Sequence, residues 1–210
     1  MDEIFIRKAR IQDLPYLYEI CLKTGDYGKD AGDLFSDPYL IGQYYAAPYL
    51  LYPAGIGFVA GQNRRPKGYI IAVPDSNDFN RWMEETWLPP LRECYPKPIP
   101  KELIRSENEK RILEIFHNNQ LDNADKDLYA NYPAHLHIDL LPELQGKGTG
   151  RKLMDTLFAE LGRQKVTGVH LGVSKKNPAA VAFYHKLEFA VFHEHEWGFT
   201  MIKDIYQTTG

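Results

Sequence analysis

A glycine-rich stretch in the last third of the chain has the residue types and spacing of an anion-binding loop. It joins a predicted strand over residues 135–141 to a predicted helix that ends at Gly162. Glycines let the backbone approach a ligand closely, and the free N–H groups and dipole of the first helical turn attract negative charge. The loop therefore predicts a phosphate or pyrophosphate site formed by Gln145, Gly146, Lys147, Gly148, Thr149, Gly150 and Arg151.

Two common phosphate motifs do not fit this loop. A Walker A motif needs Ser or Thr after its Gly-Lys pair, but Gly148 follows Lys147. A dinucleotide fingerprint needs a third glycine where Arg151 stands, and it usually follows an early strand of the chain. From the loop alone, the remaining alternative is a glycine-rich helix start that binds no ligand.

A second motif lies at residues 173–189, after another predicted strand. Asn177 and Pro178 are expected to open a helix there, as its N-cap and its first residue. Spacings of three and seven residues place Ala180 and Tyr184 on the same helix face as Asn177. This helix therefore presents a polar group and a phenol on one face.

The loop spacing Gln145-x-x-Gly148-x-Gly150, followed by this helix, resembles the two cofactor elements of the GNAT superfamily of N-acetyltransferases. The resemblance implies that acetyl-CoA is the co-substrate, that no metal is used, and that a primary amine attacks the thioester directly. It also implies that the strand before the loop pairs with the pantetheine arm and that Tyr184 protonates the leaving thiolate. The implied cofactor-binding residues are Ile138, Asp139, Leu140, Gln145, Gly146, Lys147, Gly148, Thr149, Gly150, Arg151, Asn177, Ala180 and Tyr184.

A closer resemblance covers nearly the whole chain. Four stretches are similar to the C-terminal acetyltransferase-like domain of eukaryotic O-GlcNAcase: Asp33 to Leu51, Trp87 to Glu102, Tyr132 to Glu143 and Asn177 to Phe189. The resemblance implies a stand-alone relative without a glycoside hydrolase domain. The phosphate loop of the eukaryotic domain is degraded, whereas Gln145, Gly148 and Gly150 are intact here. We therefore expect acetyl-CoA binding; a non-catalytic acetyl-CoA-sensing or peptide-binding module of the same fold is the alternative.

Candidates for the general base lie on the strand before the loop. Strand alternation places His135, His137 and Asp139 on one face. Aralkylamine N-acetyltransferases carry a similar Ala-His-Leu-His run one residue further from their loop, and other GNAT members use a Glu at the position of Gly172, which cannot act as a base. The catalytic candidates are thus His137 and Asp139 as base and Tyr184 as acid. The same three strand residues also have the spacing of a metal triad, which the metal-free chemistry of the family disfavours.

The acceptor site is expected beside the segment that follows the first helix. Residues 26–52 interleave carboxylates with aromatic rings, which can attract an ammonium group or stack on a sugar. Asp26 and Tyr27 are the substrate-binding candidates there, and Trp197 is expected to contribute from a late turn. Packing or capping roles are the alternative for each of these residues. A lysine side chain, a peptide N-terminus, an amino sugar and a small amine all stay open as acceptors.

The elements that must position these groups follow an α/β pattern. Strands are expected at residues 4–7, 57–60, 68–73, 135–141, 169–173, 189–194 and 197–202. Helices are expected over 14–25, from Phe79 to the Pro89-Pro90 pair, after a Ser106/Glu109 capping box and in the two motifs above, with residues 26–53 irregular. We expect one GNAT-type domain over residues 1–210, with a mixed, mostly antiparallel sheet of about seven strands flanked by helices. A helical insertion is expected over residues 75–133, between the third and fourth strands.

Composition and charge exclude several classes of protein. The 210 residues include 25 Lys and Arg against 28 Asp and Glu, a net charge of -3, so the basic face that binds nucleic acid or anionic membranes is not expected. No apolar run approaches the roughly 18 residues of a membrane span, and the N-terminus does not read as a signal peptide. Only Cys21 and Cys94 are present, which fits a reducing cytoplasm. Aromatic residues make up 13% of the chain, and those of the insertion could form a homodimer surface.

Overall fold

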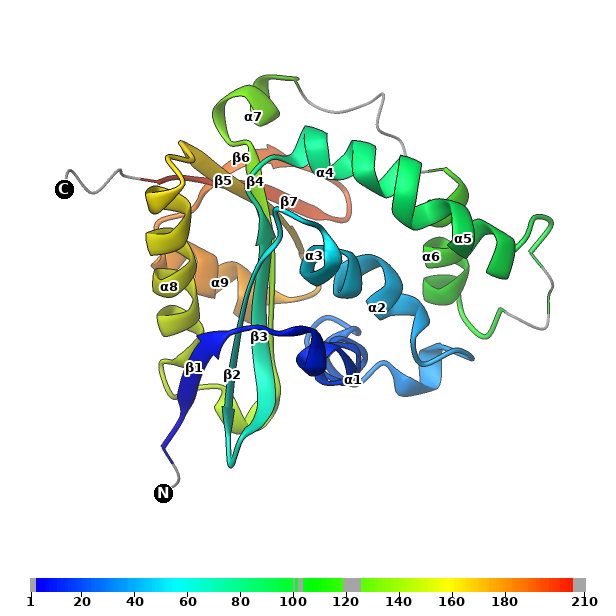
Figure 1. The fold of residues 1–210 in the computed structure, drawn as a ribbon, viewed down its shortest axis with the longest axis horizontal. Helices are drawn as coiled ribbons and strands as arrows, with labels where there is room; N and C mark the ends of the chain where they lie inside the picture. Colours follow the sequence, from blue (N-terminus) through cyan, green and yellow to red (C-terminus); the bar gives the residue numbers. More distant parts are fainter. Residues whose placement is uncertain (1–2, 100, 102–103, 119–125, 206–210) are drawn as a thin grey trace.

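A mixed seven-stranded sheet runs through the centre of the molecule, with helices on both faces (Figure 1). The computed structural model describes residues 3–99, 101, 104–118 and 126–205. Residues 100, 102–103 and 119–125 of the predicted insertion lie outside the described residues. Within the described part, none of the helices is both long enough and apolar enough to span a membrane.

The sheet has the strand order β1-β2-β3-β4-β5-β7-β6. Its strands are β1 (Phe5–Lys8), β2 (Ile56–Gln62), β3 (Arg65–Val73), β4 (Ala134–Leu140), β5 (Gly168–Ser174), β6 (Ala190–Glu194) and β7 (Gly198–Asp204). Every neighbouring pair is antiparallel except β4 and β5, which are parallel. The predicted mixed, mostly antiparallel sheet is therefore confirmed.

The two parallel strands are paired only at their beginnings. Their register joins Ala134 to Val169 and His135 to His170, and the pairing stops there. On its other side, β4 stays paired with β3 up to Leu140. The edge of β4 that faces β5 is consequently open over its second half, directly before the predicted phosphate loop.

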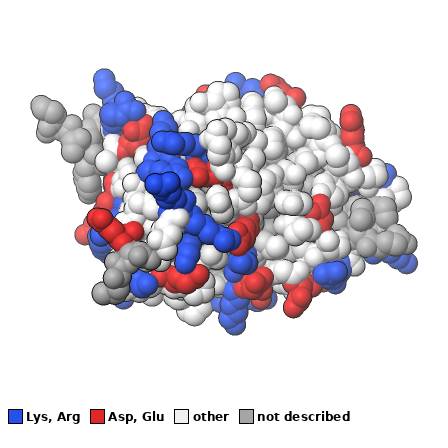
Figure 2. Space-filling view, turned by 60° about the horizontal axis from the view of Figure 1, so that its bottom comes forward, with Lys and Arg blue, Asp and Glu red and all other residues white. Residues whose placement is uncertain are grey.

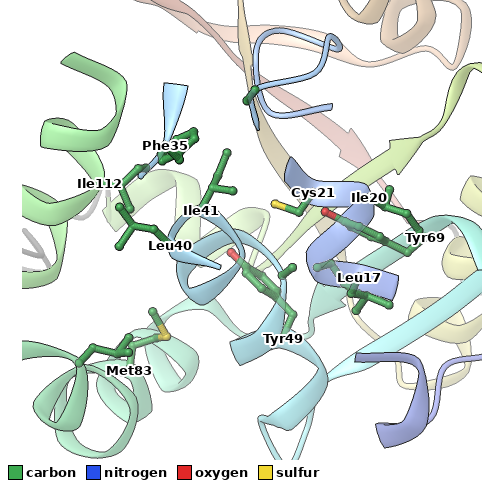
Figure 3. Close-up of a cluster of buried hydrophobic side chains, with 14 of the residues drawn as sticks. Leu17, Ile20, Cys21, Phe35, Leu40, Ile41, Tyr49, Tyr69, Met83 and Ile112 are labelled. Atoms are coloured by element: carbon green, nitrogen blue, oxygen red, sulfur yellow. The ribbon is translucent and has the colours of Figure 1, made fainter. Parts of the chain in front are cut away.

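Each face of the sheet has its own hydrophobic core. One core packs under α1 (Leu14–Thr24), α2 (Leu40–Tyr45) and α3 (Ala47–Leu51), and Figure 3 shows Cys21, Tyr49 and Tyr69 among its buried side chains. The other core packs under α8 (Thr149–Arg163) and α9 (Pro178–Lys186). Short 3-10 turns lie beside the helices: η1 (Ile11–Asp13), η2 (Gly32–Leu34) and η6 (Pro142–Leu144).

Most of the described chain between β3 and β4 is helical. It forms α4 (Ser76–Trp82), the π-helical turn η3 (Met83–Trp87), α5 (Leu88–Cys94), α6 (Glu107–His117) and α7 (Lys126–Asn131). The prediction that a helix ends at Pro89-Pro90 was wrong, because both prolines lie in the first turn of α5. The helical run continues through them, because Trp87 and Leu88 keep right-handed helical angles and the Leu88 N–H bonds to the Met83 carbonyl in the π-helical turn that precedes the prolines.

The segment over residues 26–53 was also predicted wrongly. The sequence predicts an irregular segment, but it contains α2 and α3. These helices have only 6 and 5 residues, too few for a helical repeat of apolar positions to be visible in the sequence. Tertiary packing stabilises them, since Leu40, Ile41 and Tyr49 are buried in the core beneath α1.

Candidate active site

The predicted phosphate loop joins β4 to α8 through η6. Gly146 and Gly148 have φ values of 68° and 75°, in the left-handed region that favours glycine. A Cβ at either position would meet no described atom within 4 Å, so both residues face open space. Gly148 is the N-cap of α8, and no side chain of the described residues caps this helix. Its first-turn N–H groups are therefore available to an anion.

Thr149 supplies an independent sign that a ligand belongs here. It is buried at the first position of α8, and its hydroxyl oxygen has no hydrogen-bond partner in the described part of the chain. A buried hydroxyl without a partner costs about 1–3 kcal/mol. An anion at the helix start would supply that partner. The start of α8 lies on the side that is turned forward in Figure 2, and a band of Lys and Arg side chains crosses that face.

Other residues of the loop hold its shape. The Gln145 amide donates to the Leu140 carbonyl at 2.8 Å, and Arg151 donates to the Lys186 carbonyl at 3.0 Å. A Cβ at Gly150 would lie 3.2 Å from the Phe183 ring, so this glycine lets α8 pack closely on α9. Lys147 is exposed. Contacts of these residues with a cofactor stay a prediction.

Helix α9 carries the second motif and begins as predicted. Asn177 accepts the Ala180 N–H at 3.1 Å, and Pro178 is the first helical residue. Tyr184 is buried and packs against the rings of Phe183 and Phe189. Burial raises the pKa of Tyr184, and the nearby Asp139 carboxylate raises this pKa further. The phenol is therefore protonated at neutral pH, which is the state that a general acid needs.

The two base candidates lie on the same face of β4 but in different surroundings. Asp139 accepts a 2.5 Å hydrogen bond from the Tyr69 hydroxyl, and burial raises the pKa of its carboxyl while the hydrogen bonds from Tyr69 and Thr24 oppose that rise. His137 instead turns toward α3 and contacts Tyr49. Ile138 and Leu140 point to the opposite face and pack in the core under α8. The predicted alternation along the strand is thus present.

Two histidines of β4 share one tyrosine. The Tyr49 hydroxyl lies 2.8 Å from Nε2 of His135 and 2.9 Å from Nε2 of His137. On its other side, Nδ1 of His135 lies 2.7 Å from the Ser76 hydroxyl, which itself lies 2.7 Å from the Pro133 carbonyl. Burial lowers the pKa of His135 well below its ordinary value and lowers the pKa of His137 to about 4. Both rings are therefore neutral at physiological pH.

The direction of this hydrogen-bond chain follows from counting hydrogens. The Pro133 carbonyl can only accept, so Ser76 donates its single hydrogen there and accepts from Nδ1–H of His135. Nε2 of the neutral His135 then accepts from Tyr49, whose oxygen accepts from Nε2–H of His137. The remaining nitrogen of His137, Nδ1, carries a lone pair. A neutral imidazole with a free lone pair can accept a proton.

This lone pair belongs to a residue that lines a cavity of about 410 Å³ on the α1–α3 side of the sheet. The cavity lies where β4 and β5 separate, because both strands contribute to its floor. Its wall residues come from the sheet, from α2 and α3, from the helical segment after β3 and from the β6–β7 turn. They are His135, His137, His170, Gly172, Tyr44, Tyr45, Tyr49, Phe79, Asn80, Met83, Ile115, Tyr129 and Trp197.

Of the three predicted substrate-binding residues, one lines this cavity and two do not. Trp197 lines it, and its ring would lie 3.1 Å from a Cβ at Gly172. Asp26 and Tyr27 are not among the wall residues; they form a tight turn in which Tyr27 lies under the Lys176 ammonium, 5.3 Å from its ring centre. A role for these two residues in substrate binding stays a prediction.

The triad spacing of His135, His137 and Asp139 is not realised as a cluster around one point. Both imidazoles turn Nε2 to Tyr49, whereas the carboxylate is bonded to Tyr69. Among the described residues, no group of three or more His, Cys, Asp and Glu side chains is arranged to hold a metal ion.

Comparison with known proteins identifies the family. Residues 26–189 match the acetyltransferase (GNAT) family. The chain belongs to this family. Its structure is similar to the crystal structure of SsHAT, with 30% sequence identity, a TM-score of 0.85 and coverage of 97% of this chain and 99% of that one. The chain is therefore an acetyltransferase with the GNAT fold.

Two more distant structures share the GNAT fold and contain the co-substrate or its product. The PaiA N-acetyltransferase of Thermoplasma acidophilum, in complex with coenzyme A, has 18% identity and a TM-score of 0.59, with 96% and 99% of the two chains covered. The putative acetyltransferase yncA of Salmonella typhimurium, with acetyl-CoA, has 17% identity and a TM-score of 0.55, with 99% and 97% covered.

Several side chains of this GNAT site escape sequence reasoning. Tyr49 was anticipated only as one aromatic residue among many, because its histidine partners lie 86 and 88 positions away. Ser76 and His170 gave no signal as site residues. His170 comes to lie beside His135 only through the register of two parallel strands, which the sequence does not show. Its Nδ1 lies 2.7 Å from the Tyr132 carbonyl, and burial lowers the pKa of its ring.

Proposed function

We propose that the protein transfers the acetyl group of acetyl-CoA to a primary amine by direct attack of the amine on the thioester. One observation carries this proposal: His137, whose Nδ1 has a free lone pair, lines a cavity at the point where β4 separates from β5, and the same strand leads through η6 to an uncapped helix start. This reaction requires a base beside the open edge of the strand to take the proton of the amine. It also requires an anion site at the end of the strand to hold the phosphates of the co-substrate.

The residues at the loop fit a phosphate-bearing co-substrate. The orphaned hydroxyl of Thr149, the open space at Gly146 and Gly148, and the free N–H groups of α8 would hold the pyrophosphate. The unpaired edge of β4 at residues 138–140 offers backbone groups to the pantetheine amides. When bound, acetyl-CoA supplies an activated acetyl group as its thioester.

Two residues carry out the proton transfers. Nδ1 of His137 accepts the proton that the amine loses as the new C–N bond forms, and Tyr49 holds the ring in the required tautomer through the bond to Nε2. Tyr184 gives its proton to the sulfur as the C–S bond breaks. Asp139 lies close enough to Tyr184 to raise the pKa of this phenol, and it accepts the Tyr69 hydrogen bond instead of lining the cavity.

The closer relationship that the sequence suggests is also part of the proposal. We propose a relative of the O-GlcNAcase C-terminal domain that has kept its co-substrate loop, and the intact Gln145, Gly148 and Gly150 support this loop. A cytoplasmic location is proposed as well, supported by two cysteines that are both free, one buried and one exposed.

Calorimetric titration of the full chain with acetyl-CoA tests the first step. We expect saturable binding that Gly148→Glu abolishes, because this change places a carboxylate among the phosphate-binding N–H groups. Gly148→Gln is the matched control, since it has the same length and the same strained backbone but no charge, and it should lose less affinity. Equal binding by both variants, or no binding by the natural protein, would overturn the proposal. Binding without turnover of any amine would instead favour the non-catalytic module.

A further inference from the structure

The part of the cavity wall beside His137 that the structure describes is aromatic and carries no formal charge. Four tyrosines and Trp197 contribute rings, and no Asp, Glu, Lys or Arg is among the described residues that line it. The rings belong to separate elements: Tyr45 from α2, Tyr49 from α3, and Tyr129 from α7. A volume of about 410 Å³ is within the range of sites for compact ligands, roughly 300–1,000 Å³.

We propose that this cavity accepts a small primary amine carrying a flat aromatic body, and that Nε2 of His170 accepts a hydrogen bond from its amino group. The inference rests on the proposed function and names its substrate class. A lysine side chain of a polypeptide would bring a flexible aliphatic chain that makes no ring-on-ring contacts with this wall. A flat ring instead gains stacking and edge-to-face contacts with the surrounding rings.

The orientation of His170 follows from its hydrogen bond. The Tyr132 carbonyl can only accept, so Nδ1 of His170 carries the hydrogen and Nε2 carries the lone pair. Tyr132 is not a wall residue of the cavity, whereas the His170 ring is, so the Nδ1 edge is turned away from the cavity and the Nε2 edge is left for a ligand. The ring is held flat against Tyr129, at 5.3 Å and 21°.

Neighbouring strands thus bring two imidazole lone pairs to one cavity. His137 belongs to β4 and His170 to β5, and both rings have their other nitrogen anchored inside the protein. An amino group has more than one N–H, so one hydrogen can bond to His170 while the proton to be lost faces His137. In this arrangement His170 positions the amine and His137 takes its proton.

A comparison of amines tests the substrate class. Release of coenzyme A by the full chain is followed with 2-phenylethylamine, glucosamine and a lysine-containing peptide of neutral sequence. We expect kcat/KM for 2-phenylethylamine to exceed that for the peptide by about 10-fold or more. Calorimetric titration of the same amines into the protein measures binding without turnover, and the aromatic amine should bind more tightly. If the lysine peptide matches or exceeds 2-phenylethylamine in both kcat/KM and affinity, the proposed substrate class is overturned and the acetyltransferase function is left intact.

Variants of His170 test separately whether this residue accepts a hydrogen bond from the amine. His170→Asn can keep the donor to Tyr132 but lacks the Nε2 lone pair, whereas His170→Phe lacks both. We expect His170→Asn to raise KM for 2-phenylethylamine about 10-fold, the worth of one hydrogen bond, with little change in kcat or acetyl-CoA affinity. His193→Asn, on the exposed strand β6, is the control and should change neither constant.

The outcomes separate this inference from the proposed function. An unchanged KM in His170→Asn with a stable fold removes the assigned role of His170. Failure of the natural protein to bind acetyl-CoA removes the acetyltransferase function, and the calorimetric comparison of amines still decides whether the cavity prefers an aromatic ligand.

Discussion

At the scale of single residues, the tautomer of one histidine determines what this site can do. This tautomer is set from a distance by a chain of hydrogen bonds. The Pro133 carbonyl sets the direction of the Ser76 hydroxyl, which sets the tautomer of His135. Tyr49 then donates to His135 and accepts from His137, which sets the tautomer of His137. Each member has one hydrogen to donate and donates it in the direction of Pro133, so the free lone pair is on Nδ1 of His137, the last residue of the chain of hydrogen bonds. The strand pattern alone leaves His137 and Asp139 as equal candidates, and their different partners separate them.

Replacing His137 by Gln separates its proposed role as a base from its hydrogen bond to Tyr49. A Gln side chain can place its amide N–H where Nε2–H was, and so keep the bond to Tyr49, but it has no basic nitrogen. We expect kcat to fall about 100-fold or more while acetyl-CoA affinity is retained. Steady-state kinetics and calorimetry on the same preparation measure both. Unchanged kcat would show that another group takes the proton.

At the scale of elements, sequence reasoning succeeded where a segment carries its own signal. The loop, the Asn177 cap and the alternation of β4 are local patterns, and all are present. Helices α2 and α3 were missed because packing on distant core residues, not local periodicity, stabilises them. The same reason hid the wall of the cavity, since Tyr49, Ile115 and His170 meet only after the chain has folded.

Helix α6 shows how a remote element is tied to the site. Glu109 is buried, and its carboxylate accepts the Ser36 N–H and hydroxyl, both at 2.7 Å, and the Arg105 N–H at 2.6 Å. The sequence predicts its capping box correctly in part: Ser106 accepts the Glu109 N–H, but the Glu109 carboxylate bonds to Arg105 and Ser36. This carboxylate thereby joins α6 to the segment that leads into α2.

We expect Glu109→Gln to destabilise the protein by about 2 kcal/mol. One carboxylate oxygen becomes an NH2 group that faces an N–H, which leaves a buried donor without an acceptor. Glu107→Gln is the matched control in the same first turn, because its side chain is 91% exposed and its change should stay within about 0.5 kcal/mol. Urea unfolding at pH 7 measures both variants. Equal stabilities would show that the three hydrogen bonds of Glu109 contribute nothing net.

At the scale of the whole molecule, the sheet separates two environments. The α8–α9 face is an apolar core beside the predicted phosphate loop, whereas the α1–α3 face buries imidazoles among aromatic rings. Burial lowers the pKa of His135, His137 and His170 alike. The folded protein therefore binds fewer protons on these groups than the unfolded chain does at mildly acidic pH, which couples the site to global stability.

This coupling predicts a specific acid sensitivity. The pKa of His137 is about 4 in the folded protein against an ordinary value of 6.5, so its contribution to stability is fully present above pH 6.5 and is lost as pH falls toward 4. Groups facing it are Tyr45, Tyr49 and His135, which carry no charge at these pH values until His135 itself titrates. Between pH 7 and 4.5, the free energy of unfolding should fall by about 2 kcal/mol less in His137→Gln than in the natural protein, because the variant no longer carries this imidazole.

Urea unfolding at the two pH values, with His193→Gln on β6 as the exposed control, measures the difference. Parallel losses in the natural protein and in His137→Gln would show that the ring is already solvated, and the cavity would then be a wet site instead of the dry one that lowers the pKa of His137.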